Sequence, residues 1–329
     1  METPSKMTVL VTGCAGFIGA RTAELFIEAG HTVVGLDNLN DYYDLRVKEY
    51  RLNRLKKLEG FSFVTLDIED RSGLEILFQE HEFDAVVNLA ARAGVRASIT
   101  DPYVYLSTNT LGSLNLLDLM REYDVKKFVM ASTSSLYAGV PMPFLETADV
   151  RQPLSPYASS KLGAETMAYS YHHLHGLDVS VLRYFTVYGP AGRPDMSPFR
   201  FTEWISRGEP ICLYGNGEQT RDFTYIDDIA KGTVAATELC AGYEIYNIGG
   251  GNEPISINTM IGEIERHLGK KAIIDFQPQN NADMQDTSAN IDKAIHKLNW
   301  KPKVHPMDGL ERTVKWHFEN NDWLEGVHL

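Results

Sequence analysis

Hydrophobic and polar positions divide the first half of the chain into short apolar runs separated by stretches with helical spacing. The apolar runs are rich in Val, Ile and Leu, which predicts buried strands at Thr8–Thr12, Thr32–Leu36, Phe61–Leu66, Ala85–Leu89, Lys127–Ala131 and Val179–Leu182. The stretches between them predict helices near Phe17–Ala29, Leu74–Glu80, Val104–Glu122 and Tyr157–His175. Strands that alternate with helices form a parallel sheet covered on both faces, so we expect a doubly wound α/β fold.

After Tyr184 the pattern becomes irregular, and a loop rich in Gly and Pro interrupts it. The elements predicted beyond this loop are a strand at Ile211–Tyr214, a helix at Asp227–Leu239, a strand at Glu244–Ile248, and helices at Ser256–Leu268 and near Gly309–Glu319. We expect residues 1–183 to form one domain, to which the chain returns at about 223–249. Residues 184–222 and 250–329 would then form a smaller, substrate-binding lobe.

Three glycines at spacings of three, Gly13, Gly16 and Gly19, connect the first predicted strand to the first predicted helix. Glycines at such a junction let the chain turn tightly and let a pyrophosphate approach the N–H groups at the start of the helix. Asp37 follows the second strand, where a carboxylate accepts hydrogen bonds from the adenosine ribose and repels a 2′-phosphate. No arginine stands directly after Asp37, so we expect a Rossmann domain that binds NAD rather than NADP. The alternative is a glycine-rich turn that binds another nucleotide or none.

Further groove residues are expected where the strands of the sheet end. Asp67 and Ile68 follow the third strand and would meet the adenine, whereas small residues after the fourth would lie beneath the ribose and the nicotinamide. The full set expected to contact NAD is Gly13, Gly16, Phe17, Ile18, Gly19, Asp37, Asn38, Asp67, Ile68, Leu89, Ala90, Ala91, Tyr157 and Lys161.

Tyr157 and Lys161 stand four residues apart on a predicted helix, so their side chains would lie on the same face. A phenol has a pKa of about 10 and is a poor base at neutral pH, but a nearby ammonium favours the phenolate. Such a pair can remove a proton from a hydroxyl while a hydride leaves the same carbon. The pair alone also occurs by chance on solvated helices; its position after a nucleotide loop makes it a candidate for catalysis.

With the glycine loop, Ser132–Ser135 and the Tyr157/Lys161 pair in this order, the chain resembles the extended short-chain dehydrogenase/reductases over nearly its whole length. Within that group it is most similar to the UDP-glucuronate 4-epimerases. The segments that carry this closer resemblance are Leu36–Tyr43, Arg183–Met196 and Arg221–Asp228. The resemblance implies NAD as cofactor and a UDP-sugar as substrate.

The resemblance also implies roles for single residues. Tyr157 would remove the proton of the sugar 4-hydroxyl, and Thr133 would hydrogen-bond the same oxygen. Lys161 would bind the nicotinamide ribose and lower the pKa of the phenol. Arg221 would contact the pyrophosphate of UDP, and Asp283 would lie near the ribose of that nucleotide.

Oxidation of such a sugar gives a 4-keto intermediate, whose fate depends on the residues beside Thr133. Related dehydratases place an Asp-Glu pair there, and decarboxylases a Glu, whereas this chain has Ser134 and Ser135. We expect both serines to contact the substrate and the sugar to be epimerised. Arg193 can hold a sugar carboxylate with two hydrogen bonds, and Thr186 can add a hydroxyl, which together favour a uronic acid.

Three alternatives remain. The chain could be a 4-epimerase of another UDP-hexose or a UDP-glucuronate decarboxylase. It could also be a dinucleotide-sensing regulator without catalysis, although Thr133, Tyr157 and Lys161 are all present.

Composition and charge limit the other partners. Acidic residues outnumber basic ones by 44 to 31, and the formal net charge of −13 argues against nucleic acids and anionic membranes. The three cysteines fit neither a disulfide framework nor a metal site, and the chain has no apolar run of membrane-spanning length. We therefore expect a cytoplasmic protein without a metal. By resemblance, the helices near Val104–Glu122 and Tyr157–His175 would pair in a homodimer.

Overall fold

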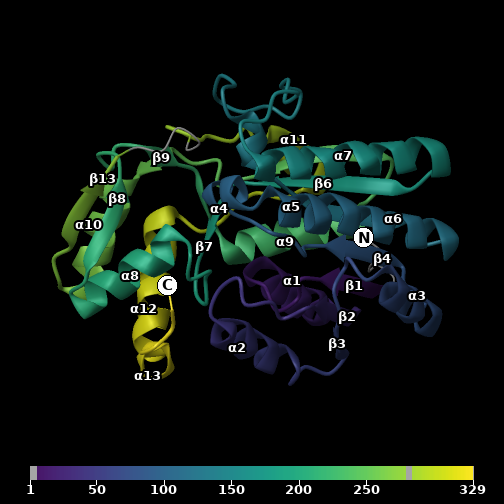
Figure 1. Cartoon of the computed structure of the whole chain (residues 1–329), viewed down its shortest axis with the longest axis horizontal. Coiled ribbons are helices and arrows are strands. Elements are labelled where there is room, and N and C mark those ends of the chain that lie inside the picture. The colour runs from purple at the N-terminus through teal and green to yellow at the C-terminus, as the bar shows by residue number, and fades with distance from the viewer. Residues whose placement is uncertain (1–5, 279–283, 329) are drawn as a thin grey trace.

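The computed structural model describes residues 6–278 and 284–328, and a parallel sheet of seven strands lies at its centre (Figure 1). From one edge to the other, the strands are β11 (Tyr243–Ile248), β6 (Asp178–Tyr184), β5 (Lys127–Thr133), β4 (Ala85–Asn88), β1 (Thr8–Thr12), β2 (Thr32–Asp37) and β3 (Phe61–Thr65). The doubly wound parallel sheet predicted from the alternation of strands and helices is confirmed. β5 extends two residues beyond its predicted end, because Ser132 and Thr133 still pair with β6.

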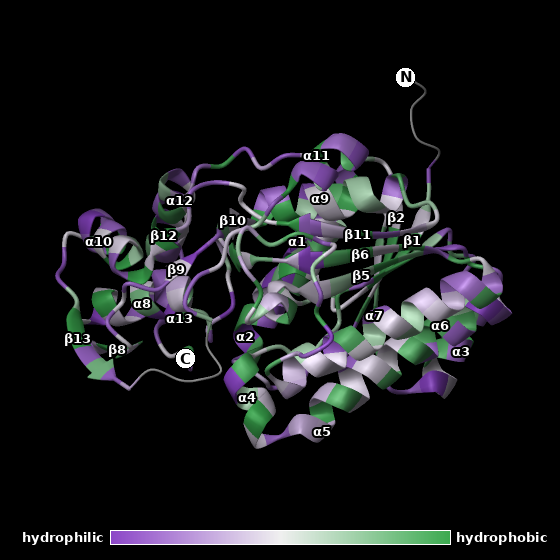
Figure 2. Cartoon of the chain, turned by 90° about the horizontal axis from the view of Figure 1, so that it is seen from above, coloured by the Kyte–Doolittle hydropathy of each residue, from purple (hydrophilic) through white to green (hydrophobic). Residues whose placement is uncertain are grey.

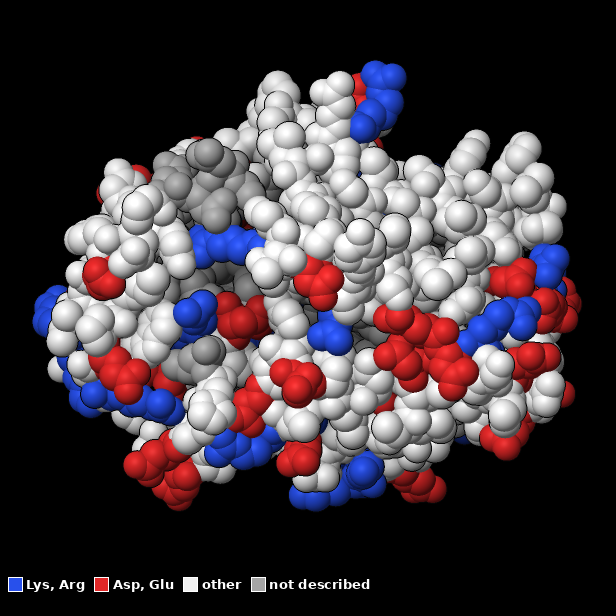
Figure 3. All heavy atoms as spheres, viewed as in Figure 1, with Lys and Arg blue, Asp and Glu red and all other residues white. Residues whose placement is uncertain are grey.

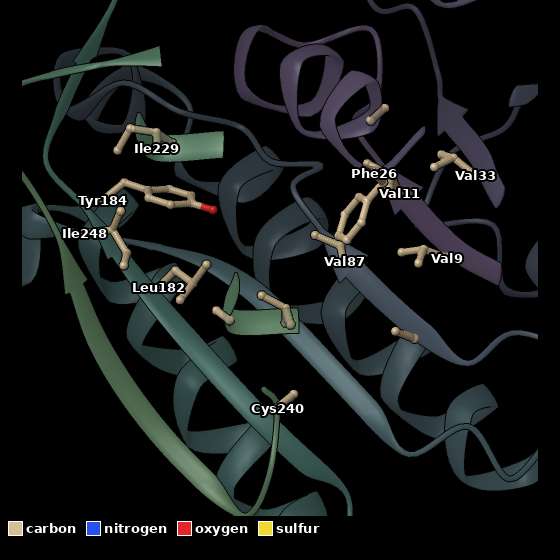
Figure 4. Close-up of a cluster of buried hydrophobic side chains, with 14 of the residues drawn as sticks. Val9, Val11, Phe26, Val33, Val87, Leu182, Tyr184, Ile229, Cys240 and Ile248 are labelled. Carbon is tan, nitrogen blue, oxygen red and sulfur yellow. The ribbon is translucent and has the colours of Figure 1, made fainter. Parts of the chain in front are cut away.

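Successive residues of the central strands point to opposite faces, and both faces are apolar. Val9 and Val11 of β1 lie near Phe26 of α1 (Phe17–Glu28), and the same apolar cluster continues to Ile229 of α9 (Ile226–Glu238), as Figure 4 shows. Leu10 lies between them and packs on the other face, with α3 (Arg71–Glu80), α6 (Gly112–Glu122) and α7 (Pro156–His175). Apolar runs of this kind are typical of parallel strands buried on both sides, and the central strands in Figure 2 are largely coloured as hydrophobic.

The helix predicted at Val104–Glu122 has three parts. It begins as α5 (Pro102–Tyr105), passes through a π-helical segment at Leu106–Leu111 and continues as α6. Within the π segment the Asn109 side chain donates to the Arg92 carbonyl and to Ser160 Oγ, each at 2.9 Å. These contacts explain the wider turn, because they bind the segment to the loop after β4 and to α7.

Outside the main sheet, the described residues form three two-stranded sheets and several helices. The strand pairs are β8 (Pro210–Tyr214) with β13 (Ile273–Gln277), β9 (Thr220–Arg221) with β12 (Ile255–Ser256), and β7 (Thr186–Tyr188) with β10 (Phe223–Tyr225). The helices are α8 (Ser197–Arg207), α10 (Ile257–Leu268), α12 (Pro306–Glu319) and α13 (Asn321–Leu324). Their buried side chains, Ile261, Ile264 and Leu310 among them, form a core apart from the two faces of the main sheet.

Five α-helices of the described residues were not predicted: α2 (Leu45–Leu55), α4 (Val95–Thr100) and α11 (Asp292–Leu298), together with α8 and α13 named above. α2 has few apolar residues, since its buried face includes Lys48 and Arg51 beside Val47, Leu52 and Leu55. Hydrophobic periodicity does not predict α2, because polar residues occupy part of its buried face. Across residues 6–278 and 284–328, none of the helices combines the length and the apolar character needed to span a bilayer.

Candidate active site

The loop between β1 and α1 makes the tight turn that its glycines predict. Gly13 has a left-handed backbone conformation, with φ of 67°, and its carbonyl accepts a hydrogen bond from the Gly16 amide at 2.9 Å. A Cβ on Gly19 would lie 2.1 Å from that carbonyl oxygen, and one on Gly13 would lie 2.7 Å from the amide nitrogen of Ala90. Only glycine therefore permits this turn, which brings the start of α1 to the edge of a cavity and fits a pyrophosphate.

Asp37, at the end of β2, is held from three sides. Its carboxylate accepts hydrogen bonds from the amides of Ala15, at 3.2 Å, and Leu39, at 2.8 Å. Nζ of Lys48 lies 3.5 Å from Oδ1, and both side chains are buried. Burial lowers the pKa of Lys48, while the negative charge of Asp37 acts to raise it. This cation was missed because it reaches the carboxylate from α2 rather than from the residues directly after Asp37.

Thr133, Tyr157 and Lys161 come together where β5 ends and α7 begins. Ser155 caps α7 by accepting a hydrogen bond from the Ala158 amide at 3.2 Å, so Tyr157 lies in the first turn. Lys161 Nζ donates to the Ala131 carbonyl of β5 at 2.9 Å. The expected meeting of both side chains with Thr133 at one site is therefore found.

Burial has the largest effect on the pKa of Tyr157 and of Lys161. Burial raises the pKa of Tyr157, and only partial compensation comes from its hydrogen bond with Thr133 and from the charge of Arg193. Burial also lowers the pKa of Lys161 to about 8, although the charge of Glu165 acts to raise it. Burial therefore outweighs the groups that favour the phenolate in this structure, and the effect of Lys161 on the pKa of the phenol stays a prediction.

Arg193 follows a loop that begins at the end of β7. Its Nε donates to Oδ1 of Asp195 at 3.0 Å, and its Nη2 donates to Oδ2 at 2.5 Å. Cζ of Arg193 lies 5.9 Å from the ring centre of Tyr42, whose hydroxyl donates to the Ala93 carbonyl at 2.6 Å. The guanidinium therefore lies between a carboxylate and an aromatic ring.

One cavity of about 360 Å³ brings nearly all of the expected residues together. Its lining includes Gly13, Gly16, Phe17, Ile18, Gly19, Asp37, Asn38, Asp67, Ile68, Leu89, Ala90, Ala91, Thr133, Ser134, Ser135, Tyr157, Lys161, Thr186 and Arg193. In Figure 3, basic atoms lie around a hollow left of centre on one face of the molecule. The cavity thus extends from the glycine loop to the serines and the arginine.

Two expected substrate residues are not in this lining. Arg221 is absent from the described residues that line the cavity, and its Nη1 donates to the carbonyls of Thr220, at 2.7 Å, and Gln285, at 3.0 Å. Asp283 lies outside the described residues.

Residues 9–249 match the model of the NAD dependent epimerase/dehydratase family. The chain belongs to this family. It is 54% identical to the UDP-glucuronate 4-epimerase of Thermodesulfobacterium geofontis, over 97% of this chain and 99% of that protein.

Solved structures of this family also match over most of the chain. The UDP-glucuronic acid 4-epimerase from Bacillus cereus in complex with UDP-glucuronic acid and NAD has a TM-score of 0.90 and 36% identity, covering 95% of this chain and 99% of that one. The UDP-glucose 4-epimerase from Thermotoga maritima with UDP-glucose has a TM-score of 0.86 and 33% identity, covering 96% and 100%.

Several side chains around the site were not predicted from the sequence. Tyr42 lines the cavity, Asp195 pairs with Arg193, and the buried Arg51 donates to the Ala191 carbonyl at 2.7 Å. Arg193 and Asp195 are two residues apart, so their pairing could have been inferred from opposite charge at short range. Arg51 offered no such signal, because its partner lies 140 residues away.

Proposed function

We propose that the chain is an NAD-dependent 4-epimerase that interconverts UDP-glucuronate and UDP-galacturonate. The observation that carries the proposal is that Arg193 lines the same cavity as Thr133, Tyr157 and Lys161. A guanidinium suits a sugar carboxylate, and a phenol with a hydroxyl partner suits proton removal from the neighbouring C4 hydroxyl. The 54% identity to a UDP-glucuronate 4-epimerase supports this substrate.

The glycine loop, Asp37 and Lys161 would hold NAD, which would supply the acceptor for the C4 hydride and the donor that returns it to the opposite face of the sugar. Tyr157 takes the proton of the 4-hydroxyl, and Thr133 hydrogen-bonds the same oxygen. Lys161 binds the nicotinamide ribose and supplies a positive charge near the phenol. The sugar leaves with no net change in oxidation state.

Ser134 and Ser135 contact the sugar without offering a carboxylate that would promote elimination. Arg193 and Thr186 bind the carboxylate at C5, which becomes a β-keto acid once C4 is oxidised. Such an acid loses carbon dioxide when the breaking bond lies parallel to the carbonyl π orbitals. The two residues hold the carboxylate out of that alignment.

The proposal also assigns the residues that bind NAD and those that bind UDP. The NAD contacts are the cavity residues from Gly13 to Ala91 named in the previous subsection, with Tyr157 and Lys161. Residues 184–222 and 250–329 form the lobe that binds UDP, with Arg221 at the pyrophosphate and Asp283 near the ribose. We place the enzyme in the cytoplasm as a homodimer.

The proposal is tested by incubating the purified protein with UDP-glucuronate, without added cofactor, and separating the products. UDP-galacturonate is the expected product, and Tyr157→Phe, the control, should lower its rate by about 10²- to 10⁴-fold. UDP-pentose as the sole product would identify a decarboxylase. Conversion of UDP-glucose but not of UDP-glucuronate would identify an epimerase of neutral hexoses, and bound NAD without turnover of either would identify a sensing protein.

A further inference from the structure

Arg193 forms a two-point ion pair with Asp195 beside the cavity. The Nε and Nη2 donors bind Oδ1 and Oδ2 at 3.0 and 2.5 Å, which commits one edge of the planar guanidinium. An arginine has five N–H donors in one plane, so this pair leaves donors on the Nη1 side for a second partner. Among the described residues, the cavity lining includes Arg193 but not Asp195, so Asp195 binds the guanidinium away from the cavity.

The backbone beneath Arg193 is fixed by other contacts. Arg51, buried on α2, donates to the carbonyls of Ala191, at 2.9 and 2.7 Å, and Gly192, at 2.7 Å. Ala191 has a left-handed conformation, with φ of 54°, which these hydrogen bonds stabilise. The Met196 amide donates to the Arg193 carbonyl at 3.1 Å and closes the next turn. The contribution of Asp195 is therefore to the side chain of Arg193 rather than to its backbone.

The pair also changes the charge that a substrate meets. An unpaired guanidinium would attract any nearby carboxylate strongly but would leave its orientation loose. Asp195 offsets part of the positive charge of Arg193, and two hydrogen bonds fix the plane of its guanidinium. The orientation of the guanidinium, and not its charge alone, then determines how the carboxylate of a sugar acid is held.

We propose that Asp195 is a positioning residue, which fixes the plane of Arg193 so that the substrate carboxylate is held out of alignment with the C4 carbonyl. This inference rests on the proposed function. Loss of the alignment control would let the C5–C6 bond break, with its electron pair passing to the enolate of the C4 ketone and carbon dioxide leaving. C5 then takes a proton and C4 takes back its hydride, so that UDP-glucuronate and one proton give a UDP-pentose and carbon dioxide without net redox change.

Asp195→Asn tests the inference, because the amide keeps the shape but loses the charge and one acceptor. The measurement is the fraction of converted UDP-glucuronate that releases carbon dioxide. This fraction should rise about tenfold or more, since small misplacements of a binding group change reaction outcomes by such factors. Asp195→Glu, which retains a carboxylate, should restore a large part of the epimerisation.

The control is Asp149→Asn. Asp149 binds Arg151 with the same spacing and the same two-point geometry, at 2.8 and 2.5 Å, but this pair is exposed and not part of the cavity lining. Its removal should leave the carbon dioxide fraction unchanged. A second measurement uses Tyr157→Phe to stop turnover: adding Asp195→Asn should change the affinity for UDP-glucuronate severalfold and that for UDP-glucose less than twofold.

An unchanged carbon dioxide fraction in Asp195→Asn, with UDP-galacturonate still formed, would overturn the inference and leave the proposed function standing. Equal losses of binding for UDP-glucuronate and UDP-glucose would also overturn it, because they would indicate a merely structural role. If the unsubstituted enzyme did not convert UDP-glucuronate at all, the proposed function would fail, and the inference with it.

Discussion

Tyr157 and Lys161 lie on one helix, and burial disfavours the charged form of each side chain. The pKa of Tyr157 is raised and that of Lys161 is lowered to about 8, so neither side chain is charged without cost. The hydrogen bond with Thr133 and the charge of Arg193 reduce this cost for the phenolate. Proton removal therefore depends on all of the surrounding groups rather than on the pair alone.

Lys161 should set the alkaline limit of activity. Its pKa falls from an ordinary 10.5 to about 8, so the native protein loses this charge as the pH rises through about 8, and kcat should fall there. Below that pH the buried charge weakens the fold, and this cost disappears between about 8 and 10.5. The measurement is kcat against pH, with Lys161→Arg as the control, because arginine keeps its proton. An identical alkaline fall in Lys161→Arg would assign the limit to another group.

Lys48 should become a 2′-phosphate ligand when its partner is removed. Asp37 holds the Lys48 ammonium at 3.5 Å, so Asp37→Asn should release that charge and shift the affinity ratio toward NADP by roughly tenfold, or about 1.4 kcal/mol. The measurement is titration of nucleotide-free protein with NAD and NADP. In Asp37→Asn combined with Lys48→Met the gain in NADP affinity should vanish; a gain that persisted would show that Lys48 is not the ligand.

At the scale of helices and strands, apolar periodicity predicted the elements whose buried faces are apolar. Every strand predicted for the sheet is present within about two residues of its expected bounds, because strands such as β1 are apolar on both sides. α2 was missed because long polar side chains occupy part of its buried face. β9 and β12, with two residues each, depend on pairing between distant segments and leave no local signal.

The site was predictable to the extent that its residues follow strand ends or stand in a fixed spacing. Gly13 and Asp37 satisfy the first condition, and Tyr157 with Lys161 satisfies the second. Contacts made by Lys48 arise only when α2 folds over the ends of the strands, and such tertiary proximity has no periodic signature. The effect of burial on the pKa of the phenol has no sequence signature for the same reason, because burial is a property of the folded chain.

Two helical glycines should respond oppositely to replacement by alanine. A Cβ on Gly309 of α12 would lie 1.9 Å from the Tyr188 hydroxyl oxygen, and Tyr188 is buried and donates to the Pro306 carbonyl at 3.1 Å. Gly309→Ala should therefore destabilise the protein by about 1–3 kcal/mol, more than the gain of about 1 kcal/mol in helix propensity.

Gly262 of α10 is the matched control, since no described heavy atom lies within 4 Å of the Cβ that alanine would add. Gly262→Ala should stabilise the protein by about 0.5–1 kcal/mol. Urea unfolding of both variants measures the difference. Stabilisation by both would mean that Tyr188 moves away freely, and that the packing between α12 and β7 is loose.

At the scale of the whole molecule, the cavity draws residues from segments far apart in sequence. Gly13, Tyr157 and Arg193 line it together, although 180 residues separate the first from the last. In Figure 1 the small lobe, with α8, α10 and α12, stands beside one end of the sheet. The geometry of the cavity therefore depends on how segments far apart in the sequence pack together.

The helical layer formed by α5, α6 and α7 should bind a second copy of the chain. Leu106 is 58% exposed on the π segment between α5 and α6, and Tyr103, Tyr169 and Leu174 are also exposed on this layer. Large exposed apolar side chains on neighbouring helices favour a protein contact. Sedimentation at micromolar concentration should therefore give twice the chain mass of 36.9 kDa.

Leu106→Asp places a charge in this contact and should shift the sedimenting species to the monomer, raising the dimer Kd by about 100-fold, or roughly 2.7 kcal/mol. Leu239→Asp is the control: Leu239 is 54% exposed but follows α9, which packs on the other face of the sheet. It should leave the dimer intact. A monomeric unsubstituted protein, or equal dissociation by both variants, would exclude this layer as the interface. Dissociation should also leave the NAD content unchanged, because the cavity residues named above all belong to one chain.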